Sequence, residues 1–308
     1  MSPVDALVWH DGTVKHASEA TVPLMSHALH YGTTVFEGLR AYEGRLGCAL
    51  FRLDDHLDRL RRSAEAYGMR LPLSRQSLRA AVHEVVRAHG GGDLYVRPMA
   101  FRGPGSMALD STGSTLDVAV AAWRLDHYFA GSHGVRVTVS PWTRISPASL
   151  VPRAKAAGHY LNSLLAKSEA AERGFDEAIM LDERGLVCEA SAMNVFVVRG
   201  GRLLTPIADD HLLDGMTRDT IRTIATGLGV DTAEHPLRPA DLHQADEILL
   251  TGTGARIVPV GQLDGSTFHA PGPVTAALTE RFEDVVRARV PEHHGWLDAV
   301  GDVRAGAR

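Results

Sequence analysis

Lysine is scarce in this chain, and one of its three lysines lies in an unusual setting. The sequence has 32 basic residues, and all except Lys15, Lys155 and Lys167 are arginines. An arginine stays protonated, whereas a desolvated lysine can lose its proton and attack a carbonyl carbon. The small residues of 154–158 around Lys155 would let a flat ring approach the backbone. The sequence therefore indicates Lys155 as an amine nucleophile, with a lysine on an alanine-rich surface turn as the alternative.

Two segments are suited to binding a phosphate group. In 214–218, Asp-Gly-Met-Thr-Arg, a glycine and a threonine lie where a helix is predicted to begin, so free backbone N–H groups converge there. In 251–254, Thr-Gly-Thr-Gly follows a predicted strand and can form a second anion-binding turn. Each segment also fits an ordinary helix cap or turn. Neither completes a P-loop or a dinucleotide fingerprint.

Two further charged residues have both a chemical and an ordinary interpretation. Glu189 lies among small residues between two predicted apolar strands, where a carboxylate is costly unless it is paired. It is either the partner of a protonated ring nitrogen or an exposed turn residue. Arg59 lies beside the apolar face of a predicted helix and is either an anion ligand or a solvated arginine. The sequence contains no His-Glu-x-x-His and no Gly-x-Ser-x-Gly motif.

Composition excludes several classes of protein. The net charge of −5 predicts no nucleic-acid partner, and no apolar run approaches the ~20 residues of a membrane span. The first residues lack the pattern of a signal peptide. Cys48 and Cys188 have no metal-like spacing, so we expect a reducing compartment and a cytoplasmic enzyme.

The elements that must position these residues are mixed in type. Helical spacing predicts helices over 53–64, with Asp54 as a possible cap, between Ser74 and the glycines of 90–92, over 162–172 and over 217–228. Apolar runs predict strands over 116–122, 135–139, 178–181, 195–198 and 247–250. Strict βαβ alternation is absent, so we expect an α+β architecture. We predict a small N-terminal domain over 1–125, a linker or mobile flap over 126–134, and a large C-terminal domain over 135–308.

A set of ordered motifs covers nearly the whole chain. They lie at 31–40 (Tyr-Gly-Thr-Thr-Val-Phe-Glu-Gly-Leu-Arg), 51–60, 95–98 (Tyr-Val-Arg-Pro), 154–160 (Ala-Lys-Ala-Ala-Gly-His-Tyr), 189–196, 215–219, 251–253 and 295–298. Together they resemble the branched-chain amino acid aminotransferases, which are fold-type IV enzymes that depend on pyridoxal 5′-phosphate. The resemblance implies two α+β domains with the cofactor in the cleft between them. Tyr-Val-Arg at 95–97 distinguishes this pattern from other enzymes of the fold.

The resemblance also implies a role for particular residues. Lys155 would form the Schiff base and move the substrate α-proton, Glu189 would face the ring nitrogen, and Tyr160 the ring 3-oxygen. The phosphate and ring would be held by Arg59, Leu213, Met216, Thr217 and Thr253. The substrate would be bound by Tyr31, Phe36, Gly38, Tyr95, Arg97, Met107, Thr253 and Gly254. Tyr31 and Met107 would come from a neighbouring subunit, which implies a homodimer or a higher homo-oligomer.

The implied reaction moves the amino group of L-leucine, L-isoleucine or L-valine to 2-oxoglutarate. Arg97 would pair with the distal carboxylate of glutamate, so that one pocket takes both apolar and acidic side chains. Met193, Gly254, Arg256 and His159 depart from the common pattern and affect the expected substrate range. The alternatives are a transaminase of the same fold with altered donor specificity, a lyase of the aminodeoxychorismate lyase type, and a non-catalytic binding protein.

Overall fold

The computed structural model describes residues 6–125, 129 and 134–301, and its contacts divide them into two compact units. The first unit comprises 6–125 together with 154–158 and 284–301, and the second comprises 129, 134–153 and 159–283. The domain expected over 135–308 therefore differs from the second unit, because two of its segments pack with the first. The expected flap over 126–134 falls largely outside the described residues.

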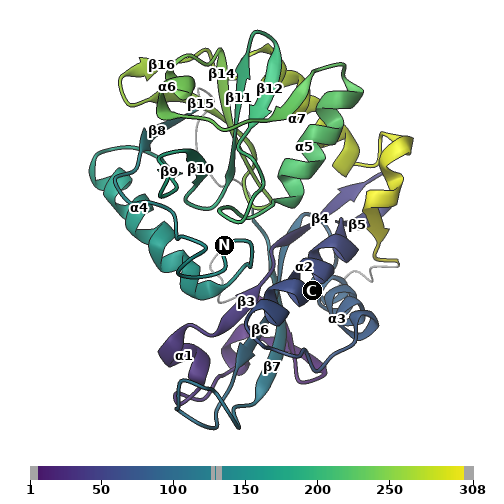
Figure 1. Ribbon diagram of the computed structural model, residues 1–308. Helices are drawn as coiled ribbons and strands as arrows, with labels where there is room; N and C mark the ends of the chain where they lie inside the picture. The colour runs from purple at the N-terminus through teal and green to yellow at the C-terminus, as the bar shows by residue number, and fades with distance from the viewer. Residues whose placement is uncertain (1–5, 126–128, 130–133, 302–308) are drawn as a thin grey trace. The chain divides into compact units, whose positions relative to one another are not determined.

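The first unit is built on an eight-stranded sheet with the order β17-β5-β4-β6-β7-β1-β2, in which β3 also pairs with β6 (Figure 1). Its strands are β1 (Leu7–His10), β2 (Thr13–His16), β3 (Thr34–Phe36), β4 (Leu39–Gly44), β5 (Gly47–Phe51), β6 (Leu94–Arg102), β7 (Leu116–Trp123) and β17 (Leu297–Ala299). Its helices are η2 (Ala17–Glu19), α1 (His27–Tyr31), α2 (Leu53–Ala66), α3 (Arg75–Ala88) and η4 (Pro291–Trp296).

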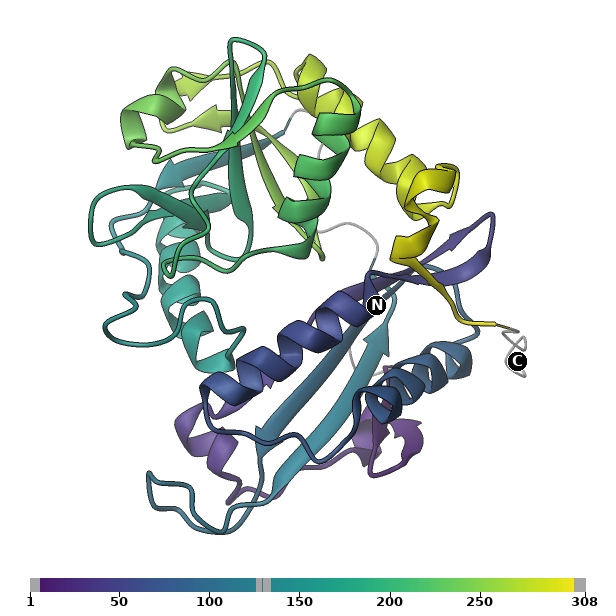
Figure 2. The same ribbon diagram turned by 45° about the vertical axis from the view of Figure 1, so that its right-hand side comes forward.

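Helices α2 and α3 lie side by side across this sheet (Figure 2). Each has one apolar face, and the leucines and valines of those faces form a single buried cluster with the sheet. Helix α3 begins as predicted, since the Ser74 side chain accepts a hydrogen bond from the Ser77 N–H at 3.0 Å. The expected cap of α2 is wrong: the N-cap is Arg52 in a left-handed conformation, and Asp54 lies within the first turn.

The second unit is built on a nine-stranded sheet with the order β10-β9-β8-β15-β14-β11-β12-β13, in which β16 also pairs with β15. Its strands are β8 (Val135–Val139), β9 (Glu177–Leu181), β10 (Val187–Ala190), β11 (Asn194–Arg199), β12 (Arg202–Thr205), β13 (Thr232–Glu234), β14 (Glu247–Gly252), β15 (Arg256–Leu263) and β16 (Ser266–Thr267). Its helices are α4 (Tyr160–Glu172), α5 (Met216–Gly227) and α6 (Pro239–His243). Helices η3 (Ala157–His159) and α7 (Pro273–Val286) each contain a boundary between the units.

Both units mix helices with largely antiparallel sheets, so the α+β expectation is confirmed. In the second unit, Ala166 and Ala170 of α4 pack on Ala178 and Met180 of β9. The small alanine side chains allow close approach of helix and strand, which fixes α4 against the sheet. Helix α4 begins at Tyr160, so the fold places this tyrosine at a helix N-terminus.

Candidate active site

Lys155 is held by its backbone within the first unit. Its carbonyl accepts a hydrogen bond from the Phe36 N–H at 3.0 Å, and its own N–H donates to Ser63 Oγ at 2.9 Å. Its Nζ lies 5.1 Å from the centre of the Phe36 ring. The flanking Ala154 and Ala156 are buried. The segment is therefore packed against β3 and α2, unlike a lysine on a surface turn.

Arg59 belongs to the same unit and points inward. It is 6% exposed and forms an ion pair with Glu37, which has no exposed surface. Glu37 was not among the residues predicted from the sequence. The position of Arg59 beside an apolar helix face could have predicted such a partner, because a buried arginine requires a buried counter-charge.

Two of the expected substrate residues, Phe36 and Tyr95, form an aromatic cage around Arg97 together with Trp123, which was not predicted from the sequence. The Arg97 guanidinium lies over the rings of Phe36, Tyr95 and Trp123 at 4.8, 5.4 and 5.4 Å, and its Nη2 donates to Tyr95 Oη at 3.2 Å. A Cβ added to Gly38 would lie 1.9 Å from Tyr95 Oη, so only glycine fits there. Among the described residues, no carboxylate pairs with Arg97, and its buried Nε has no hydrogen-bond partner.

Tyr31 and Met107 form a separate pair near α1 and the β6–β7 loop. The Tyr31 hydroxyl donates to the Met107 carbonyl at 3.1 Å. Tyr31 is 44% exposed, and the nearby Leu24, Leu29 and Leu109 are also exposed. Exposed apolar side chains that lie near one another are typical of an interaction surface.

Glu189 lies on β10 in the second unit and is buried against Arg144, which was not predicted from the sequence. The Arg144 Nε donates to Glu189 Oε1, and Glu189 Oε2 accepts from the Leu213 N–H at 3.3 Å. Burial would lower the pKa of Arg144, but the charge and hydrogen bonds of Glu189 raise it, so Arg144 stays charged. A buried carboxylate needs a partner, so the sequence could predict that Glu189 has one. Only the tertiary structure shows that the partner is Arg144.

Tyr160 is the first residue of α4, and the first turn of that helix contacts the segment that carries Arg144. Two residues further along α4, Asn162 Oδ1 accepts from the Ile145 N–H at 3.2 Å and from Arg144 Nη1 at 3.5 Å. The first turn of α4 is thereby joined to the segment that carries Arg144. Tyr160, Arg144 and Glu189 are thus brought together within one unit.

The start of α5 is fixed to the same group by its preceding loop. The Asn194 side chain donates to the Leu213 carbonyl at 2.9 Å. A Cβ added to Gly215, the N-cap of α5, would lie 2.0 Å from Asn194 Oδ1. Met216 and Thr217 then form the first turn of the helix, where backbone N–H groups have no helical acceptor. The expected anion-binding position at 214–218 therefore has the required local geometry.

The second predicted anion-binding turn lies at the end of β14. Thr253 and Gly254 follow the last residue of that strand, and β15 starts at Arg256 with a φ of 63°. Thr251 is 1% exposed, and its hydroxyl has no hydrogen-bond partner among the described residues. Arg256 Nη1 pairs with Glu283 on α7 at 3.0 Å. Met193, another departure from the family pattern, packs in the core beside Gly252.

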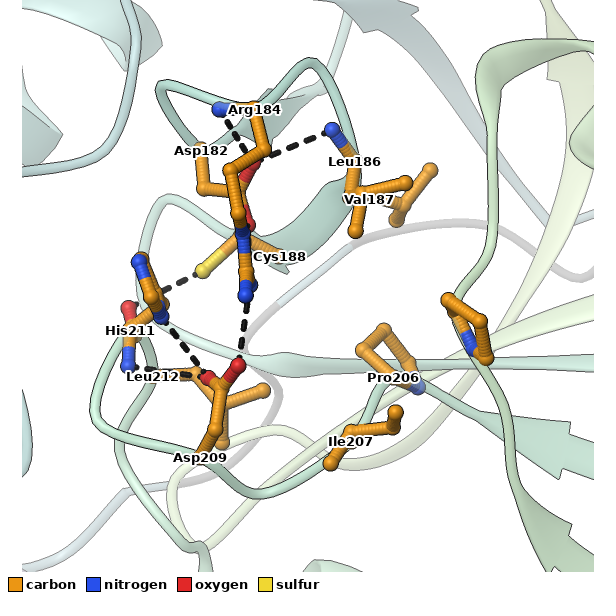
Figure 3. A pocket seen from close by; sticks show the side chains of 11 residues that line it. Asp182, Arg184, Leu186, Val187, Cys188, Pro206, Ile207, Asp209, His211 and Leu212 are labelled. Atoms are coloured by element: carbon orange, nitrogen blue, oxygen red, sulfur yellow. Dashed lines mark hydrogen bonds and ion pairs between the residues drawn. The ribbon is translucent and has the colours of Figure 1, made fainter.

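The residue before Glu189 on β10 lines a small pocket, drawn in Figure 3. This residue, Cys188, points into the pocket of about 40 Å³ and donates from its thiol to the His211 carbonyl at 3.1 Å. Burial raises the pKa of the Cys188 thiol well above its ordinary value. A buried, protonated thiol is a poor nucleophile. The sequence around Cys188 also has no recognisable catalytic motif.

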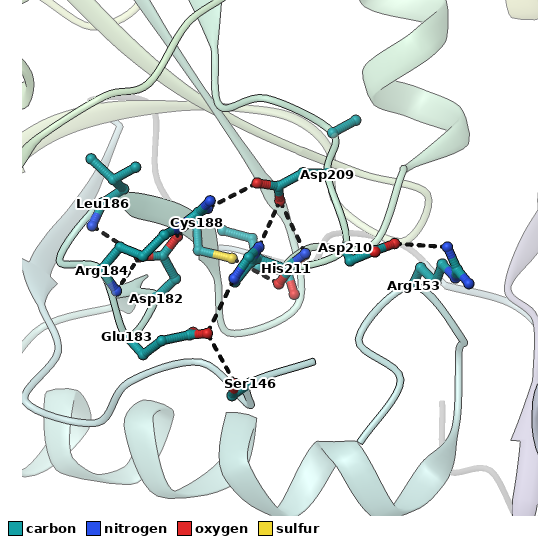
Figure 4. A network of polar contacts seen from close by, with 12 residues as sticks. Ser146, Arg153, Asp182, Glu183, Arg184, Leu186, Cys188, Asp209, Asp210 and His211 are labelled. Atoms are coloured by element: carbon teal, nitrogen blue, oxygen red, sulfur yellow. Dashed lines mark hydrogen bonds and ion pairs between the residues drawn. The ribbon is translucent and has the colours of Figure 1, made fainter. Parts of the chain in front are cut away.

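A polar network joins this pocket to the loop that precedes α5 (Figure 4). Arg184 pairs with Asp182 at 2.6 Å and with Asp209 at 2.9 Å. His211 bridges Asp209 and Glu183, at 3.0 and 3.2 Å. These contacts attach the loop to the β9–β10 turn and so support the Leu213 N–H that bonds Glu189.

The described residues contain no cluster of histidine, cysteine and acidic side chains that could hold a metal ion. None of the helices in that part of the chain is long and apolar enough to cross a membrane.

Comparison with known proteins identifies the family of this chain. The model of the amino-transferase class IV family matches residues 34–263, which include Lys155, Arg59, Glu189 and the start of α5. The chain belongs to the class IV aminotransferase family.

The relatives within that family share a more specific name. The chain is 38% identical to the branched-chain-amino-acid aminotransferase of Pseudomonas aeruginosa, over 97% of this chain and 99% of the relative. It is 40% identical to the crystal structure of the branched-chain aminotransferase of Thermoproteus uzoniensis with norvaline, with a TM-score of 0.92 over 96% of this chain and 99% of that one. A T.th. branched-chain amino acid aminotransferase complexed with N-(5′-phosphopyridoxyl)-L-glutamate is 38% identical, with a TM-score of 0.91 over 96% and 98% of the two chains. The expected fold and family are confirmed.

Proposed function

We propose that this protein is a branched-chain amino acid aminotransferase that uses pyridoxal 5′-phosphate. It transfers the amino group of L-leucine, L-isoleucine or L-valine to 2-oxoglutarate, which gives branched 2-oxo acids and L-glutamate. The relatives support this activity by name, and one of them was solved with a phosphopyridoxyl derivative of glutamate.

The residues present fit pyridoxal 5′-phosphate. Arg59 and the first turn of α5, with Met216 and Thr217, offer donors for the phosphate. Thr253 is the third proposed phosphate contact. Two residues before it, the buried Thr251 hydroxyl has no hydrogen-bond partner among the described residues. Leu213 would lie against the ring.

The bound cofactor supplies an electron sink for the carbanion that forms when the substrate α-proton leaves. Lys155 would hold it through Nζ and would carry that proton as a general base. Glu189, which is kept in place by Arg144, would accept a hydrogen bond from the protonated ring nitrogen. Tyr160 would hold the ring 3-oxygen.

The observation that carries the choice of substrates is the cage around Arg97. Its guanidinium lies against Phe36, Tyr95 and Trp123 and has no carboxylate partner in the described chain. Apolar ring faces suit a branched side chain, and the guanidinium suits the distal carboxylate of glutamate. Thr253 and Gly254 bind the α-carboxylate through backbone N–H groups. Gly38 and Tyr95 complete the pocket.

We also propose that the active form is at least a dimer, with Tyr31 and Met107 contributed to the pocket of the neighbouring subunit. The exposed apolar residues around Tyr31 support a second copy of the chain as their partner.

The test of the function combines covalent mapping with a donor panel. Borohydride reduction of the holoenzyme should leave a pyridoxyl group on Lys155, and Lys155→Arg should lose about 10⁴-fold or more in rate. A label on Lys15 or Lys167 would contradict the assignment. With 2-oxoglutarate as acceptor, the three branched donors should be the best. A different preferred donor would indicate altered specificity, and release of ammonia or pyruvate would indicate a lyase.

A further inference from the structure

Glu37 is the most completely buried acid among the described residues of the first unit, and it bonds two basic side chains of α2. Its Oε1 accepts from Arg59 Nε at 2.6 Å, and its Oε2 accepts from Arg59 Nη2 at 2.8 Å. His56 Nδ1 lies 2.7 Å from Oε2. None of these side chains is more than 7% exposed. A bidentate contact of this kind fixes both the position and the plane of a guanidinium.

The cluster is charged in the folded protein. Burial by itself would raise the pKa of Glu37, but the charge and hydrogen bonds of Arg59, together with the hydrogen bond of His56, hold that pKa well below its ordinary range. Burial lowers the pKa of His56 and outweighs the opposing effect of Glu37. His56 is therefore neutral and donates from Nδ1, since an ionised carboxylate can only accept.

The residue before Glu37 holds the backbone of Lys155. The Phe36 N–H donates to the Lys155 carbonyl, and Val35 forms a β-bridge with Ala156. From α2, Ser63 accepts the Lys155 N–H, one helical turn beyond Arg59. The end of β3 and one face of α2 thus fix both the lysine segment and the arginine.

We propose that Glu37 is a positioning residue for the cofactor phosphate, which it reaches through Arg59. The inference depends on the proposed function, because it takes Arg59 as a phosphate ligand and Lys155 as the covalent attachment. A ligand tied at one end by a covalent bond tolerates little movement of its other contact. A carboxylate that locks the guanidinium in the empty protein reduces the ordering that binding must supply.

The test compares two ligands that differ only in the phosphate. Glu37→Gln keeps the shape of the side chain but places an NH₂ group against a donor of Arg59 or His56. Apo-protein with Glu37→Gln should bind pyridoxal 5′-phosphate ~10–100-fold more weakly, as is typical when the partner of an ion ligand is removed. Its affinity for pyridoxal, which has the aldehyde but no phosphate, should change less than about 2-fold. The ³¹P resonance of the bound phosphate should also shift.

The matched control is Glu177→Gln, which alters another buried acid of an ion pair, with Lys167 at 3.0 Å. This variant should change the affinity for both ligands equally or for neither. If Glu37→Gln does not fold, Glu37→Asp retains the charge but shortens the reach, and it should weaken the phosphate ligand selectively. Arg59→Lys should abolish the additional effect of Glu37→Asp, because the bidentate contact is then gone.

Each outcome separates this inference from the proposed function. If the unaltered protein takes up no pyridoxal 5′-phosphate on Lys155, the proposed function fails and this inference fails with it. If Lys155 is labelled normally but the Glu37 variants lose affinity for both ligands alike, Glu37 has only a structural role and the inference alone is overturned. A selective loss for the phosphorylated ligand supports it.

Discussion

At the scale of single residues, Arg97 should act on only one half of the reaction. Arg97→Leu removes the partner of the distal carboxylate of glutamate and 2-oxoglutarate, so their KM should rise ~100-fold, or about 3 kcal/mol. The half-reaction with L-leucine should change far less, because its methyl groups carry no charge and would rest on Phe36, Tyr31 and the loop carrying Met107 in the proposed pocket. Stopped-flow measurement of each half-reaction checks this.

Arg256 is the control for that experiment. Its side chain pairs with Glu283 on α7, which argues against a second cationic contact for the substrate. Arg256→Leu should therefore leave the KM for 2-oxoglutarate within about 3-fold. An equal loss for leucine and glutamate in Arg97→Leu would show that Arg97 is structural and that the dual-substrate pocket is wrong.

Arg144 should contribute to the stability of the fold as well as to the position of Glu189. Arg144→Met leaves the Glu189 carboxylate buried without its cation, which should lower the free energy of unfolding by about 3 kcal/mol. The double variant Arg144→Met/Glu189→Met should recover most of that loss, since no charge is then left unpaired. Urea unfolding of the cofactor-free protein measures both.

An exposed ion pair of similar geometry provides the comparison. Arg202 Nε lies 2.6 Å from Asp231, but both side chains are more than half exposed, so Arg202→Met should cost less than about 1 kcal/mol. Equal losses of stability in Arg144→Met and Arg202→Met would contradict the prediction that the buried pair contributes more to stability than the exposed pair.

At the scale of elements, the start of α5 depends on one close approach. Gly215→Ala would bring a Cβ to 2.0 Å from Asn194 Oδ1, so the loop from Leu213 must move. We expect at least ~10-fold weaker binding of pyridoxal 5′-phosphate, because displaced helix N–H groups meet the phosphate poorly. Titration of the apo-protein, followed by cofactor fluorescence, gives the affinity.

Gly227, the last residue of α5, offers a matched control for this substitution. Gly227 is exposed, has no neighbour within 4 Å of an added Cβ, and has no strained φ. Gly227→Ala should raise stability by about 0.5–1 kcal/mol and leave cofactor affinity unchanged. Normal cofactor affinity in Gly215→Ala would show that this loop does not position the phosphate.

At the scale of the whole molecule, the proposed dimer predicts complementation between two inactive variants. Tyr31→Ala keeps the lysine but damages the neighbour's pocket, whereas Lys155→Arg keeps Tyr31 but lacks the amine. Refolding an equal mixture should restore about a quarter of the unaltered activity, since half of the dimers are hybrids with one intact site. If native mass spectrometry shows hybrid dimers but the mixture gains no activity, Tyr31 contributes to the pocket of its own subunit.

Motifs and periodicity were sufficient to predict much of the chain. The residue pattern predicted the family, the α+β class, and helices α3, α4 and α5 to within a few residues. The reason is local: apolar spacing and cap residues act within one or two turns. Lys155 was indicated because a lysine can act as an amine nucleophile and an arginine cannot, and its role stays a prediction.

Other features depended on contacts between segments that lie far apart in the sequence. Glu37 with Arg59, and Arg144 with Glu189, are pairs separated by 22 and 45 residues. Nothing in the local sequence of either acid names its partner. Residues 154–158 likewise pack with the first unit because hydrogen bonds from β3 and α2 fix their backbone. The sequence by itself determined which residue types the chemistry needs, whereas the tertiary structure decided which charges meet, because burial makes pairing obligatory but leaves the choice of partner to packing.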